Sequence, residues 1–181
     1  MEDMLIRPER AADVAAIRAV TAAAFAAAEH AAPPVEADGV PGEATLVGWL
    51  RADVGWEPRL SLVAEDEGEI IGHVVGTRGR LQDRPALGLG PLSVVPARQG
   101  QGIGSVLVHS VLAAADALGE PVAVLLGDPG FYARFGFVPA SSMGIEPPDP
   151  AWGDYFQARP LAAYDESWRG RYTYAAPFDR L

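Results

Sequence analysis

The sequence predicts an α/β (α+β) fold in which a mixed, mostly antiparallel central sheet with a splayed fourth strand is flanked by helices. Two consecutive β-branched runs resemble a hairpin, and later apolar strands alternate with helical segments. Glycine and proline interrupt one apolar run, which indicates a strand that bulges or splays. With 49% apolar and 21% charged residues, the 181 residues can bury one sizeable core, so residues 1–181 are expected to form a single domain.

The first expected elements are a short strand and two helices. Residues 4–7 are mostly apolar and precede a proline, and residues 11–28 combine strong helix formers with apolar side chains at three- and four-residue spacing. Prolines and a glycine then mark a polar loop, after which residues 43–53 carry a second apolar stripe. A strand that leads into an amphipathic helix, followed by a shorter helix, is therefore predicted.

A hairpin and a third strand are expected in the middle of the chain. Residues 60–65 and 70–76 are rich in β-branched side chains and are separated by an acidic turn that contains glycine. The Arg/Gln/Asp-rich residues 78–84 are expected to connect this hairpin to a third run at 87–95. Two glycines and a proline inside that run predict a bulge or a splayed strand, which would leave backbone groups free for a ligand.

Strand and helix alternate in the second half. A helix is expected over residues 102–118, a buried strand over 122–126, and one or two helical turns over 131–135 after an Asp-Pro N-cap. The side chains expected on the buried side of the first of these helices are Val106, Leu107, Ser110, Val111 and Ala114. Residues 140–181 are irregular and aromatic, and we expect them to add strands and long loops to the same core.

Composition excludes several classes of function. The net charge of −10, with arginine as the only basic residue apart from histidine, disfavours a protein that binds a nucleic-acid backbone. The absence of cysteine excludes disulfides, thiolate metal sites and a cysteine nucleophile. The acidic opening at residues 1–3 lacks the positive charge of a secretion signal, and no uninterrupted apolar run is long enough for a membrane span, so a cytoplasmic protein is expected.

A glycine-rich turn between a predicted strand and a predicted helix is the most informative stretch. Residues 96–105 read Pro-Ala-Arg-Gln-Gly-Gln-Gly-Ile-Gly-Ser, and the three glycines allow consecutive backbone N–H groups to face one concavity. At a helix N-terminus these donors favour a phosphate or pyrophosphate, while Arg98 and the side-chain amide of Gln99 can reach an outer oxygen. The turn therefore predicts an anion-binding cradle.

Other interpretations of the turn remain open. Plain turn chemistry needs no ligand, and a nucleotide P-loop is disfavoured because the chain has no lysine. A dinucleotide site is a weaker alternative, since it requires G-x-G-x-x-G, whereas these glycines stand at positions 100, 102 and 104 behind an antiparallel hairpin.

Two motifs resemble the GNAT superfamily of acyl-CoA N-acyltransferases. The segment 99–104 matches the family pattern Q/R-x-x-G-x-G/A, and 131–137, Phe-Tyr-Ala-Arg-Phe-Gly-Phe, resembles a second signature, F-Y-x-R-x-G-F. The preceding residues 92–96 resemble the family's splayed fourth strand and its exit. The resemblance covers residues 4–139 and implies the GNAT fold, with 140–181 as a C-terminal extension.

The resemblance implies acetyl-CoA as the cosubstrate. The coenzyme-binding residues that it implies are Leu92, Ser93, Val94, Arg98, Gln99, Gly100, Gln101, Gly102, Ile103, Gly104 and Ser105. The turn would hold the pyrophosphate, and the free edge of the splayed strand would pair with the pantetheine arm. A backbone N–H, which we assign to Leu92, would bind the thioester oxygen, and Tyr132 would be the general acid that protonates the departing thiolate.

The motifs do not assign a general base. Many family members carry a glutamate on the fourth or fifth strand, but residues 86–95 and 122–126 contain no carboxylate. The candidates are His73, Glu29, His30 and a chain of water molecules. His73 also fits a packed position on the sheet, and His109 fits a solvated or packing position. Because the histidines are far apart in the sequence, no metal site is expected.

We therefore expect a cytoplasmic N-acetyltransferase that moves an acetyl group from acetyl-CoA to a primary amine by direct attack. The amine would belong to a small molecule or a peptide, with no nucleic-acid or membrane partner. The alternative is an acyl-CoA-binding regulatory module, or an inactive relative, that binds the coenzyme without turnover. The motifs do not identify the acceptor, the acyl-chain preference, the role of residues 140–181 or the oligomeric state, for which a homodimer is one option.

Overall fold

The computed structural model describes residues 4–181, so the acidic opening at residues 1–3 lies outside the described part of the chain. The helices are α1 (Val14–Ala26), α2 (Gly42–Arg51), α3 (Ile103–Ala117) and α4 (Pro129–Tyr132). The strands are β1 (Leu5–Pro8), β2 (Trp56–Asp66), β3 (Glu69–Leu81), β4 (Arg84–Val94), β5 (Val122–Leu126), β6 (Val138–Pro139), β7 (Ile145–Glu146), β8 (Phe156–Pro160) and β9 (Gly170–Thr173). Six short 3-10 helices complete the secondary structure, and they are η1 (Ala11–Asp13), η2 (Pro96–Arg98), η3 (Ala133–Phe135), η4 (Ala140–Met143), η5 (Pro150–Tyr155) and η6 (Ala176–Arg180). None of the helices described has the length and hydropathy needed to cross a bilayer.

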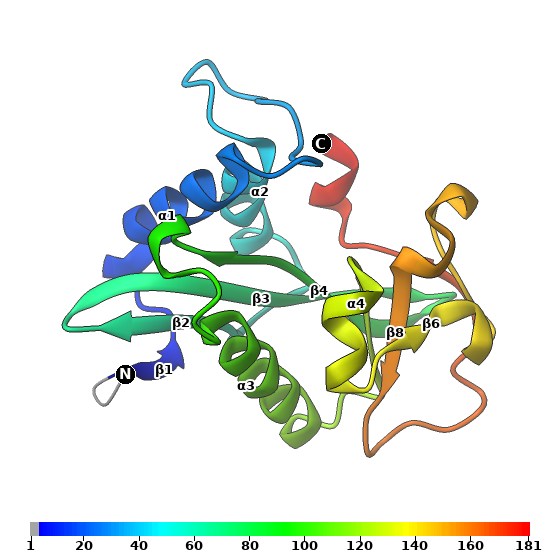
Figure 1. Cartoon of the computed structure of the whole chain (residues 1–181). Helices are drawn as coiled ribbons and strands as arrows, with labels where there is room; N and C mark the ends of the chain where they lie inside the picture. The colour runs from blue at the N-terminus through cyan, green and yellow to red at the C-terminus, as the bar shows by residue number, and fades with distance from the viewer. Residues whose placement is uncertain (1–3) are drawn as a thin grey trace.

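A mixed sheet forms the centre of the molecule, with α1 and α2 on one face and α3 on the other (Figure 1). The strand order is β1-β2-β3-β4-β5-β8-β6, and β9 joins β3 to β7. Only the β4–β5 and β7–β9 pairs are parallel. The predicted fold class, a mostly antiparallel mixed sheet flanked by helices, is confirmed.

The hairpin between β2 and β3 closes through the predicted turn. Glu67 and Gly68 both have positive φ angles, 49° and 83°, which is the backbone twist that a two-residue hairpin requires. Glycine adopts such angles without steric cost, and one non-glycine residue there is tolerated. The local turn chemistry therefore fixes the position of this hairpin.

The connection that the sequence predicts at residues 78–84 is wrong. Residues 78–81 continue β3, and β4 begins at Arg84, which leaves a two-residue turn. Arg80 pairs with Thr173 of β9, and the Arg78 guanidinium lies 2.6 Å from a carboxylate oxygen of Glu120. Residues 78–81 also pair with residues 84–87 of β4 across this turn. The composition concealed the strand because the partners of its charged side chains lie far away in the sequence.

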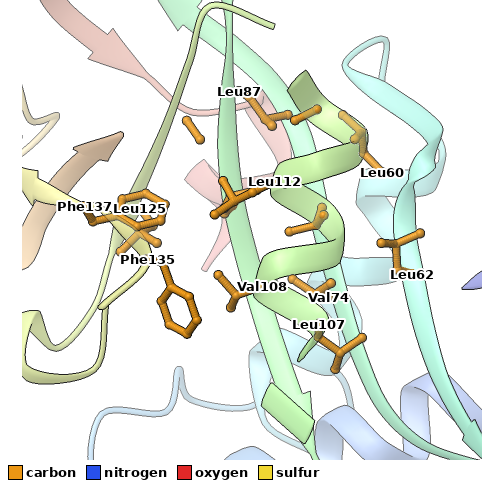
Figure 2. Packing of buried hydrophobic residues seen from close by; sticks show 14 of the residues in the cluster. Leu60, Leu62, Val74, Leu87, Leu107, Val108, Leu112, Leu125, Phe135 and Phe137 are labelled. Atoms are coloured by element: carbon orange, nitrogen blue, oxygen red, sulfur yellow. The ribbon is translucent and has the colours of Figure 1, made fainter. Parts of the chain in front are cut away.

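Helix α3 packs its apolar face against the sheet (Figure 2). Its buried residues are Ile103, Leu107, Val108, Val111, Leu112 and Ala115. They meet side chains of β2, β3, β4 and β5 together with Phe135 and Phe137, which follow α4. The predicted face is therefore rotated, because Val106 is exposed while Ser110 and Ala114 are only half-buried. Truncating one of the buried leucines to alanine is expected to cost about 2–5 kcal/mol.

The opposite face is covered by α1, α2 and the C-terminal segment. Ile17 of α1 packs with Val47 of α2 and Val63 of β2. Farther along the sheet, Phe156 and Tyr172 are fully buried against residues of β3, β4 and β5. Residues after position 140 thus pack on this sheet, and the chain ends near α2 (Figure 1).

Candidate active site

A gap opens in the sheet where β4 and β5 separate. The two strands pair only through Leu87 with Ala123 and Gly88 with Val124. Beyond Gly88, the β5 side of β4 has no strand partner among residues 4–181. The register between β3 and β4 shifts in the same region, where the Gly90–Pro91 peptide bond is cis. The predicted bulge and splay of this strand are therefore present.

The backbone of β4 directs two residues toward the gap. The N–H group of Val95 donates to the carbonyl of Ile71 at 3.0 Å, on the β3 side. Because hydrogen-bonded and non-hydrogen-bonded pairs alternate in an antiparallel ladder, Ser93 also bonds toward β3. The N–H and C=O groups of Leu92 and Val94 consequently face the gap, where an extended ligand can pair with them.

The N-terminus of α3 supplies a row of free backbone donors. Gly100 and Gly102 have φ angles of 75° and 86°, and a Cβ atom at either position would meet nothing within 4 Å. None of the six N–H groups of residues 100–105 donates to another group in the described part of the chain. Free amides at the positive end of a 15-residue helix form an anion-binding site.

A cavity of about 640 Å³ joins this turn to the gap. Its lining residues are Ala24, Phe25, Ala28, Leu92, Val94, Arg98, Gln99, Gly100, Gly102, Ile103, Gly104, Ser105, Phe131 and Arg134. Nine of the eleven predicted coenzyme-binding residues are among them, and Ser93 and Gln101 are not. The charged lining residues are both arginines, so this cavity is locally positive in a chain of net charge −10. Such a lining favours a ligand that is anionic at one end and apolar elsewhere.

Two side chains in the turn already have partners. The Gln99 side-chain amide donates to the Val94 backbone carbonyl at 3.0 Å. The Arg98 guanidinium lies 2.8 Å from an Asp66 carboxylate oxygen and donates to the side-chain oxygen Oε1 of Gln101 at 3.0 Å. The Gln99 amide therefore ties the turn to the end of β4 with one N–H, and its second N–H remains for the phosphate oxygen that the sequence predicts.

Arg134 is a lining residue to which the sequence reasoning gave no role. Its guanidinium lies 4.9 Å from the ring centre of Phe131, and it forms no ion pair among the residues described. The sequence could have indicated Arg134 because it closely follows the predicted N-cap, Asp128. The Asp128 side chain accepts a hydrogen bond from the Gly130 N–H group and so fixes the start of α4. Arg134 is therefore a second cation available to a phosphate.

Tyr132 lies beside the gap, next to the cavity residue Phe131. Its ring makes edge contacts with Phe131 and Phe137, with ring centres 4.8 and 5.8 Å apart, and it packs on the cluster around α3. A Cβ atom on Gly127, which directly follows β5, would come within 2.5 Å of this ring. Burial raises the pKa of Tyr132 to about 12, so the phenol keeps its proton at neutral pH.

His73 lies inside the protein and does not line the cavity. It is fully buried, and its Nε2 atom lies 2.8 Å from the Ser61 hydroxyl and 3.5 Å from Glu9. Burial lowers the pKa of His73 more than the neighbouring Glu9 raises it. Burial alone would raise the pKa of Glu9, but bonds from His73, Arg51 and Ser61 lower it to about 2. His73 is thus a packed residue in a polar network, as one interpretation of the sequence had it, and the structure does not support it as the base.

The other two candidate bases, Glu29 and His30, and also His109 are not among the cavity's lining residues. Glu29 and His30 are exposed after the end of α1, and His109 is exposed on α3 with its ring edge-on to Phe135 at 4.9 Å. Across residues 4–181 no group of three or more histidine, cysteine or acidic side chains is arranged to hold a metal ion. The cavity thus offers cations and backbone donors, and no carboxylate from the described part of the chain lines it.

Comparison with known proteins places these features in one family. The model of the acetyltransferase (GNAT) domain matches residues 57–139. The uncharacterized N-acetyltransferase YhbS of Escherichia coli is 34% identical over 161 residues, which are 88% of each chain. The uncharacterized N-acetyltransferase YjhQ of the same species is 36% identical over 113 residues, 60% of this chain and 62% of that relative.

Two solved structures share the fold along nearly the whole chain. A GNAT family acetyltransferase from Brucella melitensis, in complex with acetyl-CoA, has a TM-score of 0.76 and 36% identity, and the match covers 99% of this chain and 100% of that one. E. coli YhbS in complex with CoA has a TM-score of 0.82 and 32% identity, with 99% and 93% covered.

Proposed function

The chain belongs to the GNAT family of acetyltransferases, and we propose that it transfers an acetyl group from acetyl-CoA to a primary amine. The observation that carries this proposal is the row of free amides at residues 100–105, which adjoins the open edge of β4 in one cavity. The related structures in complex with acetyl-CoA and CoA support the choice of ligand. We also propose that residues 1–181 form a single catalytic domain.

The coenzyme would be held by two kinds of contact. The free amides of residues 100–105, with Arg98 and Arg134 beside them, suit the pyrophosphate. The backbone groups of Leu92 and Val94 suit the amide groups of the pantetheine arm, which would lie along β4 as an added half-strand. Both contacts direct the thioester toward the gap between β4 and β5.

The chemistry follows from the groups around the gap. The nitrogen of a neutral amine attacks the thioester carbon, a C–N bond forms, and the C–S bond breaks. The N–H group of Leu92 stabilises the negative charge that develops on the thioester oxygen. Tyr132 donates its proton to the departing sulfur and regains one from solvent, which takes up the surplus proton of the nitrogen, so the proton balance closes.

A second candidate function is coenzyme binding without turnover. It is favoured by the cavity lining, to which residues 4–181 contribute no carboxylate or histidine that could accept the proton of an ammonium ion. A protein of this kind would bind acetyl-CoA and act as a regulatory module.

The test begins with thermal unfolding of the protein in the presence of acetyl-CoA, CoA and NAD. A ligand that binds only the folded chain stabilises it by RT ln(1 + [L]/Kd), or about 2.7 kcal/mol at a hundredfold excess over Kd. We expect stabilisation by both CoA forms and none by NAD. An absence of stabilisation at millimolar acetyl-CoA contradicts the coenzyme assignment, and stabilisation by NAD alone supports a dinucleotide site.

Release of free CoA thiol in a panel of primary amines then separates an enzyme from a binding module. The panel includes amino acids, polyamines, aminoglycosides and peptides with free N-termini. Sustained thiol release that depends on an amine shows acetyl transfer. Tight acetyl-CoA binding without thiol release for any amine favours the regulatory module.

A further inference from the structure

Tyr174 lies on the sheet face opposite Tyr132, in the C-terminal segment that leaves β9. Its ring centre lies 4.9 Å from that of Tyr172, at a right angle, and 4.7 Å from that of Phe178. The next residue, Ala175, is buried in the apolar cluster formed with α2, and Phe178 packs on the same cluster. The backbone and ring of Tyr174 are therefore held from both sides.

Two glycines place Tyr132 and Tyr174 at the same gap. A Cβ atom on Gly88 would come within 2.9 Å of the Tyr174 ring, and one on Gly127 within 2.5 Å of the Tyr132 ring. Gly88 is the last residue of β4 that pairs with β5, and Gly127 directly follows β5. Each ring thus rests on bare backbone where the strands separate, one from each face of the sheet.

The Tyr174 hydroxyl makes no hydrogen bond with any group in residues 4–181, whereas the neighbouring Tyr172 hydroxyl donates to the Ala86 carbonyl at 3.2 Å. Burial raises the pKa of Tyr174, and the nearby Tyr132 raises it further. The phenol therefore remains protonated at neutral pH, and its oxygen has free lone pairs. The contacts described above use only the ring, so the hydroxyl is available to a ligand.

The direction of attack brings the acceptor to this hydroxyl. A thioester oxygen bound by a backbone N–H of β4 lies close to the plane of the sheet, as the carbonyl of a paired strand does. A nucleophile approaches a carbonyl from above or below its plane, which here means from one face of the sheet. Tyr132, Phe131 and α4 occupy one face, and Tyr174 borders the other.

We propose that the Tyr174 hydroxyl binds the acceptor, accepting a hydrogen bond from an N–H of the neutral primary amine and turning its lone pair toward the thioester carbon. This inference rests on the proposed acetyl transfer and adds the group that orients the amine. Tyr174 neither gains nor loses a proton overall, because the surplus proton of the nitrogen goes to solvent and the sulfur receives one from Tyr132.

The test is Tyr174→Phe, which keeps the ring and removes only the hydroxyl. With the amine that gives the fastest thiol release in the panel, kcat/KM for that amine is expected to fall about tenfold, the equivalent of one good hydrogen bond. The Kd for acetyl-CoA and the unfolding temperature are expected to stay unchanged, because Tyr174 does not line the coenzyme cavity and its hydroxyl makes no hydrogen bond within residues 4–181.

Tyr164→Phe is the matched control. Tyr164 belongs to the same C-terminal segment but lines a separate hollow with Ser142 and Arg169. Its kinetics are expected to equal those of the unaltered enzyme. The inference is overturned if Tyr174→Phe and the unaltered enzyme have the same kinetics for the amine. It is also overturned if the variant loses acetyl-CoA affinity by the same factor as kcat/KM for the amine. Neither result contradicts the proposed acetyl transfer. Absence of acetyl transfer by the unaltered enzyme overturns the proposed function and this inference with it.

Discussion

Tyr132→Phe separates the chemistry of Tyr132 from its packing. The hydroxyl has no hydrogen-bond partner among residues 4–181, and the edge contacts with Phe131 and Phe137 involve only the ring. The free energy of unfolding should therefore change by less than about 0.5 kcal/mol. Tyr132→Ala, in contrast, removes a packed ring and should cost about 3–5 kcal/mol.

The size of the catalytic effect follows from two pKa values. Burial raises the pKa of Tyr132 to about 12, whereas a thiol has a pKa of about 8.5, and each unit is worth about 1.4 kcal/mol. Complete proton transfer from this phenol to a thiolate is thus uphill by about 5 kcal/mol. Tyr132 is therefore expected to stabilise the departing sulfur chiefly through a hydrogen bond to a charged atom, worth about 1.5–3 kcal/mol, and solvent replaces the proton that the phenol gives to the sulfur.

The expected result is a fall in kcat of about 10- to 150-fold with an unchanged Kd for acetyl-CoA. Thiol release under saturating amine gives kcat, and isothermal titration calorimetry gives the Kd. Unchanged kcat would remove Tyr132 from the mechanism, and a parallel loss of affinity would show that the hydroxyl binds the coenzyme in its ground state. In the unaltered enzyme, Tyr132 should cause no loss of rate up to about pH 10, because the phenol remains protonated there.

Three further predictions address the cradle, the buried network and the missing base. Gly102→Val should weaken CoA binding at least about tenfold. The control is Gly119→Val, which has a similar positive φ at the other end of α3, outside the cavity, and should lower only the stability of the fold, by about 1–3 kcal/mol. Equal CoA affinities of the two variants in calorimetry argue against the cradle. The pKa of Glu9 is lowered to about 2 in the folded protein, so the ionised carboxylate stabilises the fold fully above about pH 4.5. The free energy of unfolding should therefore fall by about 3 kcal/mol between about pH 4.5 and 2. In Glu9→Gln this free energy should depend less on pH over the same range. With no base in the cavity, kcat/KM for an alkylamine should rise with pH toward the pKa of the amine, about 10, and a plateau near pH 7 would indicate a base.

Local sequence signals were sufficient for the elements whose partners are close in the chain. The acidic turn with Gly68 fixed the hairpin, the Asp-Pro pair at 128–129 fixed the start of α4, and the glycines at 100 and 102 fixed the turn before α3. In each case a required φ angle or an N-cap is satisfied by the residue itself or its near neighbours. The coenzyme side of the site was predictable for this reason.

Features that depend on distant partners were not predictable. Helix α3 is apolar over much of its surface, so only the position of the sheet decides that Leu107 and Leu112 face inward and Val106 faces solvent. Residues 78–81 pair with residues 84–87 of β4, but their charged composition hid this strand, because the carboxylate that pairs with Arg78 belongs to Glu120, farther along the chain. His73 was ambiguous because its burial and its contact with Glu9 arise from the packing of three different elements.

The two sides of the gap are built from different parts of the sequence, and this explains why the motifs indicate a coenzyme but no acceptor. On our proposal, residues 92–105 supply most of the coenzyme side, so one contiguous segment encodes the greater part of it. On our proposal, the acceptor side depends on Tyr174, which reaches β4 only because β9 and the segment after it anchor on β3 and α2. Substitutions in this C-terminal segment can therefore change the acceptor while the coenzyme side remains intact. The acceptor specificity of the enzyme should accordingly follow the residues around Tyr174 and not the glycine-rich turn.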